Sequence, residues 1–162
     1  MSDVVRLTHL NSAGEAHIVD IGEKQSTSRR ALAEAHLIAE PATVDAIFGG
    51  SLKKGDALAV ARIAGIMAAK KTADLIPLCH PITLTSVTVD ITRAEQPGTI
   101  HIVATAATTG QTGVEMEALA AASTAALTLY DMAKGIDRAM TVTNLRVVEK
   151  SGGKSGDFRR QP

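Results

Sequence analysis

Large aromatic side chains are nearly absent from this sequence, and this restricts how its core can be packed. The chain has no tryptophan, one tyrosine and two phenylalanines, whereas alanine occurs 27 times. A core of Ala, Leu, Ile and Val fills space only if backbones approach one another closely, as when helices lie flat on a sheet. The scarcity of rings also argues against base stacking, which proteins that bind single-stranded nucleic acids rely on.

Length and charge are those of an ordinary globular protein. The 162 residues suit one domain, which we expect over residues 1–162 with flexible ends at 1–15 and 150–162. Seventeen basic and seventeen acidic residues give a formal net charge of zero. The chain therefore lacks the basic excess of a nucleic-acid partner, and a neutral surface favours self-association.

The single cysteine and the hydropathy of the chain indicate in which cellular compartment the protein is expected. Cys79 is the only cysteine, so no internal disulfide can form. The N-terminus lacks the basic and apolar regions of a signal peptide. The longest uncharged apolar stretch, residues 118–130, is too short for a bilayer, which needs about 20 residues. We expect a cytoplasmic protein without a membrane partner.

The hydrophobic pattern alternates between the periods of strands and helices. Strands are predicted at residues 16–21, 29–39, 82–93, 99–107 and 140–149. Helices are predicted at residues 41–48, 56–75 and 116–134, and the glycine-rich tail 150–156 is expected to be irregular. Residues 29–39 are ambiguous, because propensity favours a helix whereas alternation favours a strand.

From residue 29 onward, this order of elements is β-α-β-β-α-β with a short extra helix. It predicts an α+β fold of the ferredoxin-like split βαβ type. In such a fold two long helices cover one face of an antiparallel sheet, here with an additional N-terminal strand.

The first group of candidate functional residues is Leu78-Cys79-His80, enclosed between Pro77 and Pro81. A lone cysteine cannot supply a four-ligand zinc site, and no partner that would activate the thiol is evident in the sequence. Packing is therefore the favoured role for Cys79. His80 lies on a loop between a helix and a strand, where functional residues tend to gather.

Glu115 and Glu117 form the second group, directly after a Gly/Thr-rich loop. Acidic residues at a helix start also simply favour the helix dipole. If this stretch is helical, the two side chains point about 200° apart and cannot share one site. If it is extended, they lie on one face.

Lysines supply the remaining candidates. Asp131 and Lys134 are three residues apart and can form a surface ion pair, or an acid/base pair in which the aspartate holds the lysine. Lys54 precedes Asp56, which is suited to cap a helix.

The tail contains Gly153-Lys154-Ser155, which resembles the end of a P-loop. The match fails because Val148 occupies the position of the required first glycine. What remains is a glycine-rich loop whose amides, with Lys150 and Lys154, can bind a phosphate.

Together these residues describe a polyanion site with lysines, acids and a histidine. Glu117 and Asp131 are 14 residues apart on one predicted helix, which corresponds to about 21 Å. One compact site in one subunit could hardly use both, so a site that uses both must lie between subunits.

Four blocks of the sequence carry a family resemblance. They are Lys54–Pro81, Thr112–Leu119, Leu127–Arg138 and Glu149–Gly156, with shorter similar stretches at His17–Asp20 and Thr27–Ala33. They resemble the cyclic pyranopterin monophosphate synthases, the MoaC family of molybdenum cofactor biosynthesis. The resemblance runs over roughly residues 15–158. The one departure noticed is Ala133, where cysteine is common in the family.

The resemblance implies a ferredoxin-like subunit, a homohexamer built from dimers, and a site at the dimer interface. It implies a lyase that converts a cyclised dihydro-GTP into cyclic pyranopterin monophosphate and pyrophosphate. Whether Mg²⁺ accompanies the triphosphate is left open, and no other cofactor or metal is implied.

The resemblance also suggests roles for the candidate residues. The catalytic set is Asp131, Lys134, Lys54, His80 and Glu115. The substrate-binding set is Leu78, Cys79, His80, Met116, Glu117, Lys150 and Lys154. Within these sets, Lys134 beside Asp131 is our choice for the general acid/base.

Two other classes of function are compatible with such a fold. One is a nucleotide-binding module without catalysis, and the other is a scaffold for a partner complex. The charged residues gathered in four blocks favour the enzyme over both.

Overall fold

The computed structural model describes residues 10, 11 and 13–161. Of the N-terminal stretch that was expected to be flexible, residues 1–9 and 12 lie outside the described residues. The helices are α1 (Pro41–Phe48), α2 (Ala57–Lys70), α3 (Thr72–Leu75) and α4 (Glu115–Ala133). The strands are β1 (Thr27–Ile38), β2 (Ser86–Arg93), β3 (Thr99–Gly110), β4 (Thr141–Ser151) and β5 (Phe158–Arg159).

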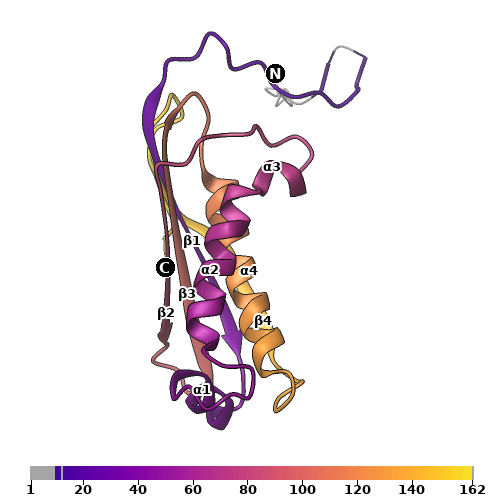
Figure 1. Cartoon of the computed structure of the whole chain (residues 1–162). Helices are drawn as coiled ribbons and strands as arrows, with labels where there is room; N and C mark the ends of the chain where they lie inside the picture. Colours follow the sequence, from indigo (N-terminus) through magenta and orange to yellow (C-terminus); the bar gives the residue numbers. More distant parts are fainter. Residues whose placement is uncertain (1–9, 12, 162) are drawn as a thin grey trace, which may run out of the picture.

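The five strands form one antiparallel sheet in the order β2-β3-β1-β4-β5. Helices α2 and α4 lie against one of its faces (Figure 1), and no helix of the described chain covers the other. This arrangement of β1 to β4 with the two long helices is the predicted ferredoxin-like α+β fold. The ambiguous segment at residues 29–39 belongs to a strand, as its alternation indicated.

The core lies between the sheet and the helices and is built mainly from small residues. Alternate residues of β1, from Ala31 to Leu37, are at most 1% exposed on the helix-facing side. Ala121 and Ala125 of α4 are fully buried. Gly65 of α2 packs so closely on α4 that a Cβ there would lie 2.8 Å from the Ala121 carbonyl oxygen. The expected close approach of backbones is thus met where the two long helices cross.

Local signals explain where the helices begin. Pro41 occupies the first turn of α1, where its missing amide hydrogen costs nothing. Asp56 caps α2 as predicted, because its side chain accepts a hydrogen bond from the Ala59 amide at 2.9 Å.

The predicted helix over residues 56–75 is interrupted, and this expectation was wrong beyond Lys70. The buried Thr72 hydroxyl donates to the Ala68 and Ala69 carbonyl oxygens, at 3.2 and 3.0 Å. A side chain that satisfies the carbonyls of the last turn competes with the continuing helix. The chain therefore turns at Lys71 and forms the separate short helix α3.

The expected N-terminal strand at residues 16–21 is absent from the described chain. Ala16 makes a single bridge to Leu10, and the Val19 carbonyl binds His80 instead of a neighbouring strand. Likewise β2 begins at Ser86 rather than at residue 82, since the Thr83 carbonyl accepts from the Thr108 hydroxyl.

Two strands end later than expected, and one short strand was not expected. β3 continues to Gly110 because it pairs with β1 as far as Thr27. β4 reaches Ser151, and the glycine-rich tail turns back to form β5 along it. Among the described residues, no helix is long and apolar enough to cross a bilayer.

The crossing of α2 and α4 predicts the effect of a single methyl group. Gly65→Ala should lower the free energy of unfolding by about 1–3 kcal/mol, because the added Cβ meets backbone that cannot rotate away. Chemical denaturation followed by circular dichroism measures this change. Gly135→Ala is the matched control: nothing lies within 4 Å of its added Cβ, so it should change stability by less than about 0.5 kcal/mol. Equal effects of the two substitutions would contradict this description of the crossing.

Candidate active site

A cluster of two lysines around one carboxylate lies at the C-terminal end of α4. Asp131 accepts from Lys54 Nζ at 2.9 Å and pairs with Lys134 Nζ at 2.7 Å. Lys54 Nζ also donates to the Asp131 carbonyl oxygen at 2.8 Å. The three side chains, about half exposed, form what we call the lysine–aspartate cluster. The structure thus brings together a loop residue and two residues from the end of a helix.

The lysines and the aspartate of this cluster shift one another's pKa values. Hydrogen bonds from Lys134 and then Lys54 lower the pKa of Asp131 to about 2. The Asp131 carboxylate in turn raises the pKa of Lys134. At neutral pH, Lys134 is therefore an ammonium group that can donate a proton, and it becomes a base only after doing so.

A second group of candidates lies at the opposite end of α4. Glu117, 2% exposed, accepts from Cys79 Sγ at 3.6 Å, and its other carboxylate oxygen has no partner among the described residues. Burial raises the pKa of Glu117. Burial, followed by the nearby Glu117 charge, raises the pKa of Cys79 to about 11. The Cys79 thiol is therefore protonated at neutral pH and poorly suited to act as a nucleophile.

A cavity of about 250 Å³ opens beside this pair, and we call it the helix-start cavity. Its lining includes Leu78, Cys79, His80, Glu115 and Met116. The structure thus places these five predicted residues around one space.

Four side chains in and around this cavity have specific partners. His80 Nε2 donates to the Val19 carbonyl at 2.6 Å, which orients the ring. Lys150 lies 3.4 Å from Glu115, its ion-pair partner. Glu115 and Glu117 both belong to the first turn of α4. Their side chains contact different partners, Lys150 and Cys79. This stretch is therefore helical rather than extended, and the two carboxylates point apart.

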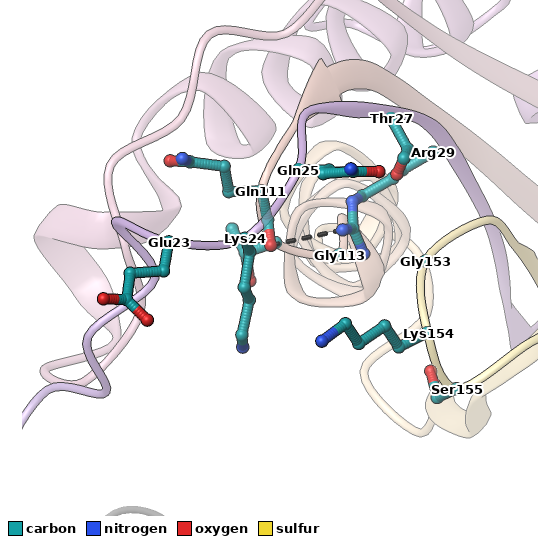
Figure 2. A pocket seen from close by; sticks show the side chains of 11 residues that line it. Glu23, Lys24, Gln25, Thr27, Arg29, Gln111, Gly113, Gly153, Lys154 and Ser155 are labelled. Atoms are coloured by element: carbon teal, nitrogen blue, oxygen red, sulfur yellow. Dashed lines mark hydrogen bonds between the residues drawn. The ribbon is translucent and has the colours of Figure 1, made fainter.

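A larger cavity, of about 720 Å³, adjoins the helix-start cavity and shares Lys24, Thr112 and Gly113 with it. Figure 2 shows the amino groups of Lys24 and Lys154 extending into this space from different segments of the chain. Arg29 also lines it, and Glu23 is the one acidic residue among its described lining residues. Three cations facing one open space make this basic cavity suited to a polyanion.

Backbone contacts hold the wall of the basic cavity. Arg29 Nε donates to the Gly110 carbonyl at 2.8 Å and Nη2 to the Gln111 carbonyl at 3.2 Å. Gly152 and Gly153 have φ values of 90° and 82°, and a Cβ on either would strike Ser28 or Arg29. The positive φ angles favour glycine at both positions; at Gly152 the Ser28 backbone leaves no room for a Cβ, whereas at Gly153 the Arg29 side chain would have to move.

Lys24 and Arg29 were not among the predicted site residues. Lys24 lies in an unpatterned polar stretch, so no local signal points to it. Arg29 belongs to a block of the family resemblance, which was the one available hint.

One chain does not bring all of the predicted residues together. Asp131 and Glu117 lie near opposite ends of α4, about 21 Å apart by helix rise. The lysine–aspartate cluster and the helix-start cavity are thus separate within the monomer.

The high pKa of the only cysteine leads to a testable result. At pH 8 a thiol with a pKa of about 11 is about one part in a thousand thiolate, so iodoacetamide should alkylate native Cys79 far more slowly than a free cysteine. The rate, followed by intact mass, should rise toward pH 11. Glu117→Gln removes the adjacent charge and should accelerate alkylation at pH 8. Fast alkylation of the native protein at neutral pH would contradict this assignment.

Comparison with known proteins finds the same family that the sequence blocks resemble. The MoaC family model matches residues 18–153. A protein named cyclic pyranopterin monophosphate synthase from Herpetosiphon aurantiacus is 56% identical over 153 residues, 94% of this chain and 93% of the relative. A protein of the same name from Parvibaculum lavamentivorans is 54% identical over 154 residues, 95% of this chain and 96% of the relative.

Proposed function

The chain belongs to the MoaC family, and from this premise we propose that it is a cyclic pyranopterin monophosphate synthase, a lyase of molybdenum cofactor biosynthesis. It converts (8S)-3',8-cyclo-7,8-dihydroguanosine 5'-triphosphate into cyclic pyranopterin monophosphate and pyrophosphate. Similarity over nearly the whole chain to relatives of that name is the observation that carries this proposal. In this proposal residues 1–162 act as one MoaC-like domain in the cytoplasm.

The reaction makes two demands on a site. A hydroxyl of the substrate must lose a proton and attack the first phosphorus, while the bond to the departing pyrophosphate breaks. Rebuilding the pterin ring requires further proton transfers. The site must therefore neutralise several negative charges and hold a group that exchanges protons.

The basic cavity meets the first demand. Lys24, Arg29 and Lys154 line it, and Lys150 of β4 donates a hydrogen bond to Ser155, which also lines it. We assign the triphosphate to this space and the fused rings to the adjoining helix-start cavity. There Leu78, Cys79 and Met116 would contact the rings, with the buried Glu117 holding the Cys79 thiol from behind, and His80 and Glu115 would serve as polar groups near the reacting atoms.

The lysine–aspartate cluster meets the second demand. Lys134 is the general acid/base, Asp131 holds its amino group, and Lys54 adds a second positive charge. Covering this half-exposed cluster would favour the neutral amine and bring the pKa of Lys134 toward a useful range.

A second subunit would supply that cover. Val60, Ile63 and Met67 form an exposed apolar stripe on α2, each at least 43% exposed, and Leu127 of α4 is 58% exposed. These residues lie on the two helices that connect the lysine–aspartate cluster with the helix-start cavity. Packing two copies along them in opposite directions would unite the cluster of one with the cavity of the other, in a dimer-based homohexamer.

The acid/base assignment predicts a loss of turnover in specific variants. With the cyclised dihydro-GTP as substrate, Lys134→Ala and Asp131→Asn should lower kcat by about 100-fold or more, because the proton donor is removed or misplaced. Pyrophosphate release and mass spectrometry of the cyclic-phosphate pterin report the rate.

The neighbouring lysines provide a matched control for this assay. Lys54→Ala should lower activity, whereas Lys53→Ala should not, since only Lys54 reaches Asp131. A folded Lys134→Ala variant with the parent's rate would remove Lys134 from the mechanism. If the parent binds the cyclised dihydro-GTP tightly but forms no product, the chain is a nucleotide-binding module. If it does not bind this substrate at all, a scaffold for a partner complex is the remaining alternative.

The shared site predicts complementation between two inactive variants. Lys134→Ala and Glu117→Gln are each first assayed alone, where we expect little activity, since each alters one half of the shared site. Refolded together in equal amounts, they should recover roughly a quarter of the parent's activity, because half of the dimers are mixed and each mixed dimer has one intact site. Light scattering should give a mass near six times 16.8 kDa. Mixed oligomers without recovered activity, or a monomer with full activity, would disprove a site between subunits.

A further inference from the structure

The uncovered face of the sheet carries a cluster that the reaction above does not use. Glu34 and His36 lie two residues apart on β1 and therefore point to the same face. His101 of β3 is the direct cross-strand partner of His36. One ligand atom from each of the three residues lies within 4.8 Å of the other two. The spacing along the chain does not indicate this cluster, because it depends on strand register.

Hydrogen bonds fix the positions of all three side chains. Glu34 is 9% exposed, and its two carboxylate oxygens accept from His101 Nε2 and Arg146 Nε, each at 2.7 Å. His36 Nδ1 lies 3.1 Å from the Asn144 side-chain amide. The two imidazole rings meet edge to face, with centroids 4.9 Å apart. The donor atoms are therefore already converged before any ligand arrives.

An irregularity in β4 brings the supporting residues to this cluster. The β1–β4 register shifts between Glu34 and His36, and Asn144 adopts the left-handed backbone conformation with φ of 53°. Such a residue in a strand is uncommon, and asparagine tolerates it better than most. The shift places Arg146 opposite Glu34 and leaves the Asn144 side chain beside His36.

We propose that Glu34, His36 and His101 bind one divalent transition-metal ion of the Zn²⁺, Co²⁺ or Ni²⁺ class. Two imidazole nitrogens and one carboxylate oxygen suit these ions, whereas Mg²⁺ and Ca²⁺ prefer oxygen donors alone. Arg146 would hold one oxygen of Glu34 and leave the other for the ion, in the way that outer partners orient metal ligands. To bind through Nε2, His101 releases the hydrogen that it shares with Glu34, either to its own Nδ1 or to solvent. Water would fill the remaining coordination positions.

The site is independent of the proposed synthase activity, so it is tested by binding alone. Tag-free protein is dialysed against EDTA, then titrated with Co²⁺ and followed by visible absorption and calorimetry. The parent should bind one equivalent. His36→Gln and His101→Gln should each weaken binding by more than about 10-fold, since even the loss of an outer partner of a ligand costs about 10- to 100-fold. His17→Gln, which alters an exposed histidine outside the cluster, should leave the affinity unchanged.

Thermal unfolding provides a second readout. Saturating Co²⁺ should raise the Tm of the parent and leave that of the His36→Gln/His101→Gln double variant unchanged. If either variant fails to fold, paramagnetic broadening of the His36 and His101 ring signals in the parent decides the matter. Unchanged affinity in the variants, or ring signals that Co²⁺ does not broaden, would overturn the proposal.

Discussion

The close contact between α2 and α4 is the constraint on which the rest of this structure depends. Gly65 faces the Ala121 carbonyl across the crossing, and the buried face of α4 is mostly alanine. Small side chains let α4 lie flat on the alanine-rich face of β1, while α2 packs beside it against β2. Dispersion contacts between backbones therefore replace the aromatic packing that most cores of this size use.

Because α4 is held in this way, it keeps a fixed distance between the carboxylates at its start and the lysine–aspartate cluster at its end. Its first turn carries buried and paired carboxylates, and its last turn carries an aspartate between two lysines. No side-chain motion could bring such distant groups together within one chain. Oligomeric assembly is then part of the catalytic apparatus in the proposed function, because it brings the two ends of different copies together.

The sequence allowed the fold to be predicted where periodicity and end signals agreed, as for α1 and the start of α2, and at β1 alternation was the better guide than helix propensity. It failed where a side chain competes with the backbone, as Thr72 does at the end of α2. The motif blocks contained most of the residues around the helix-start cavity. Lys24 was missed because a segment outside the sheet carries it to the cavity, and the Glu34–His36–His101 cluster was missed because only strand register defines it.

The glycine-rich tail has a consequence for how such a chain can evolve. Gly152 and Gly153 have no side chain that could react, yet a Cβ at Gly152 would meet the Ser28 backbone and one at Gly153 would meet the Arg29 guanidinium group. Amino-acid substitution at these two positions of the tail is therefore restricted by backbone conformation and steric contact rather than by chemical reactivity.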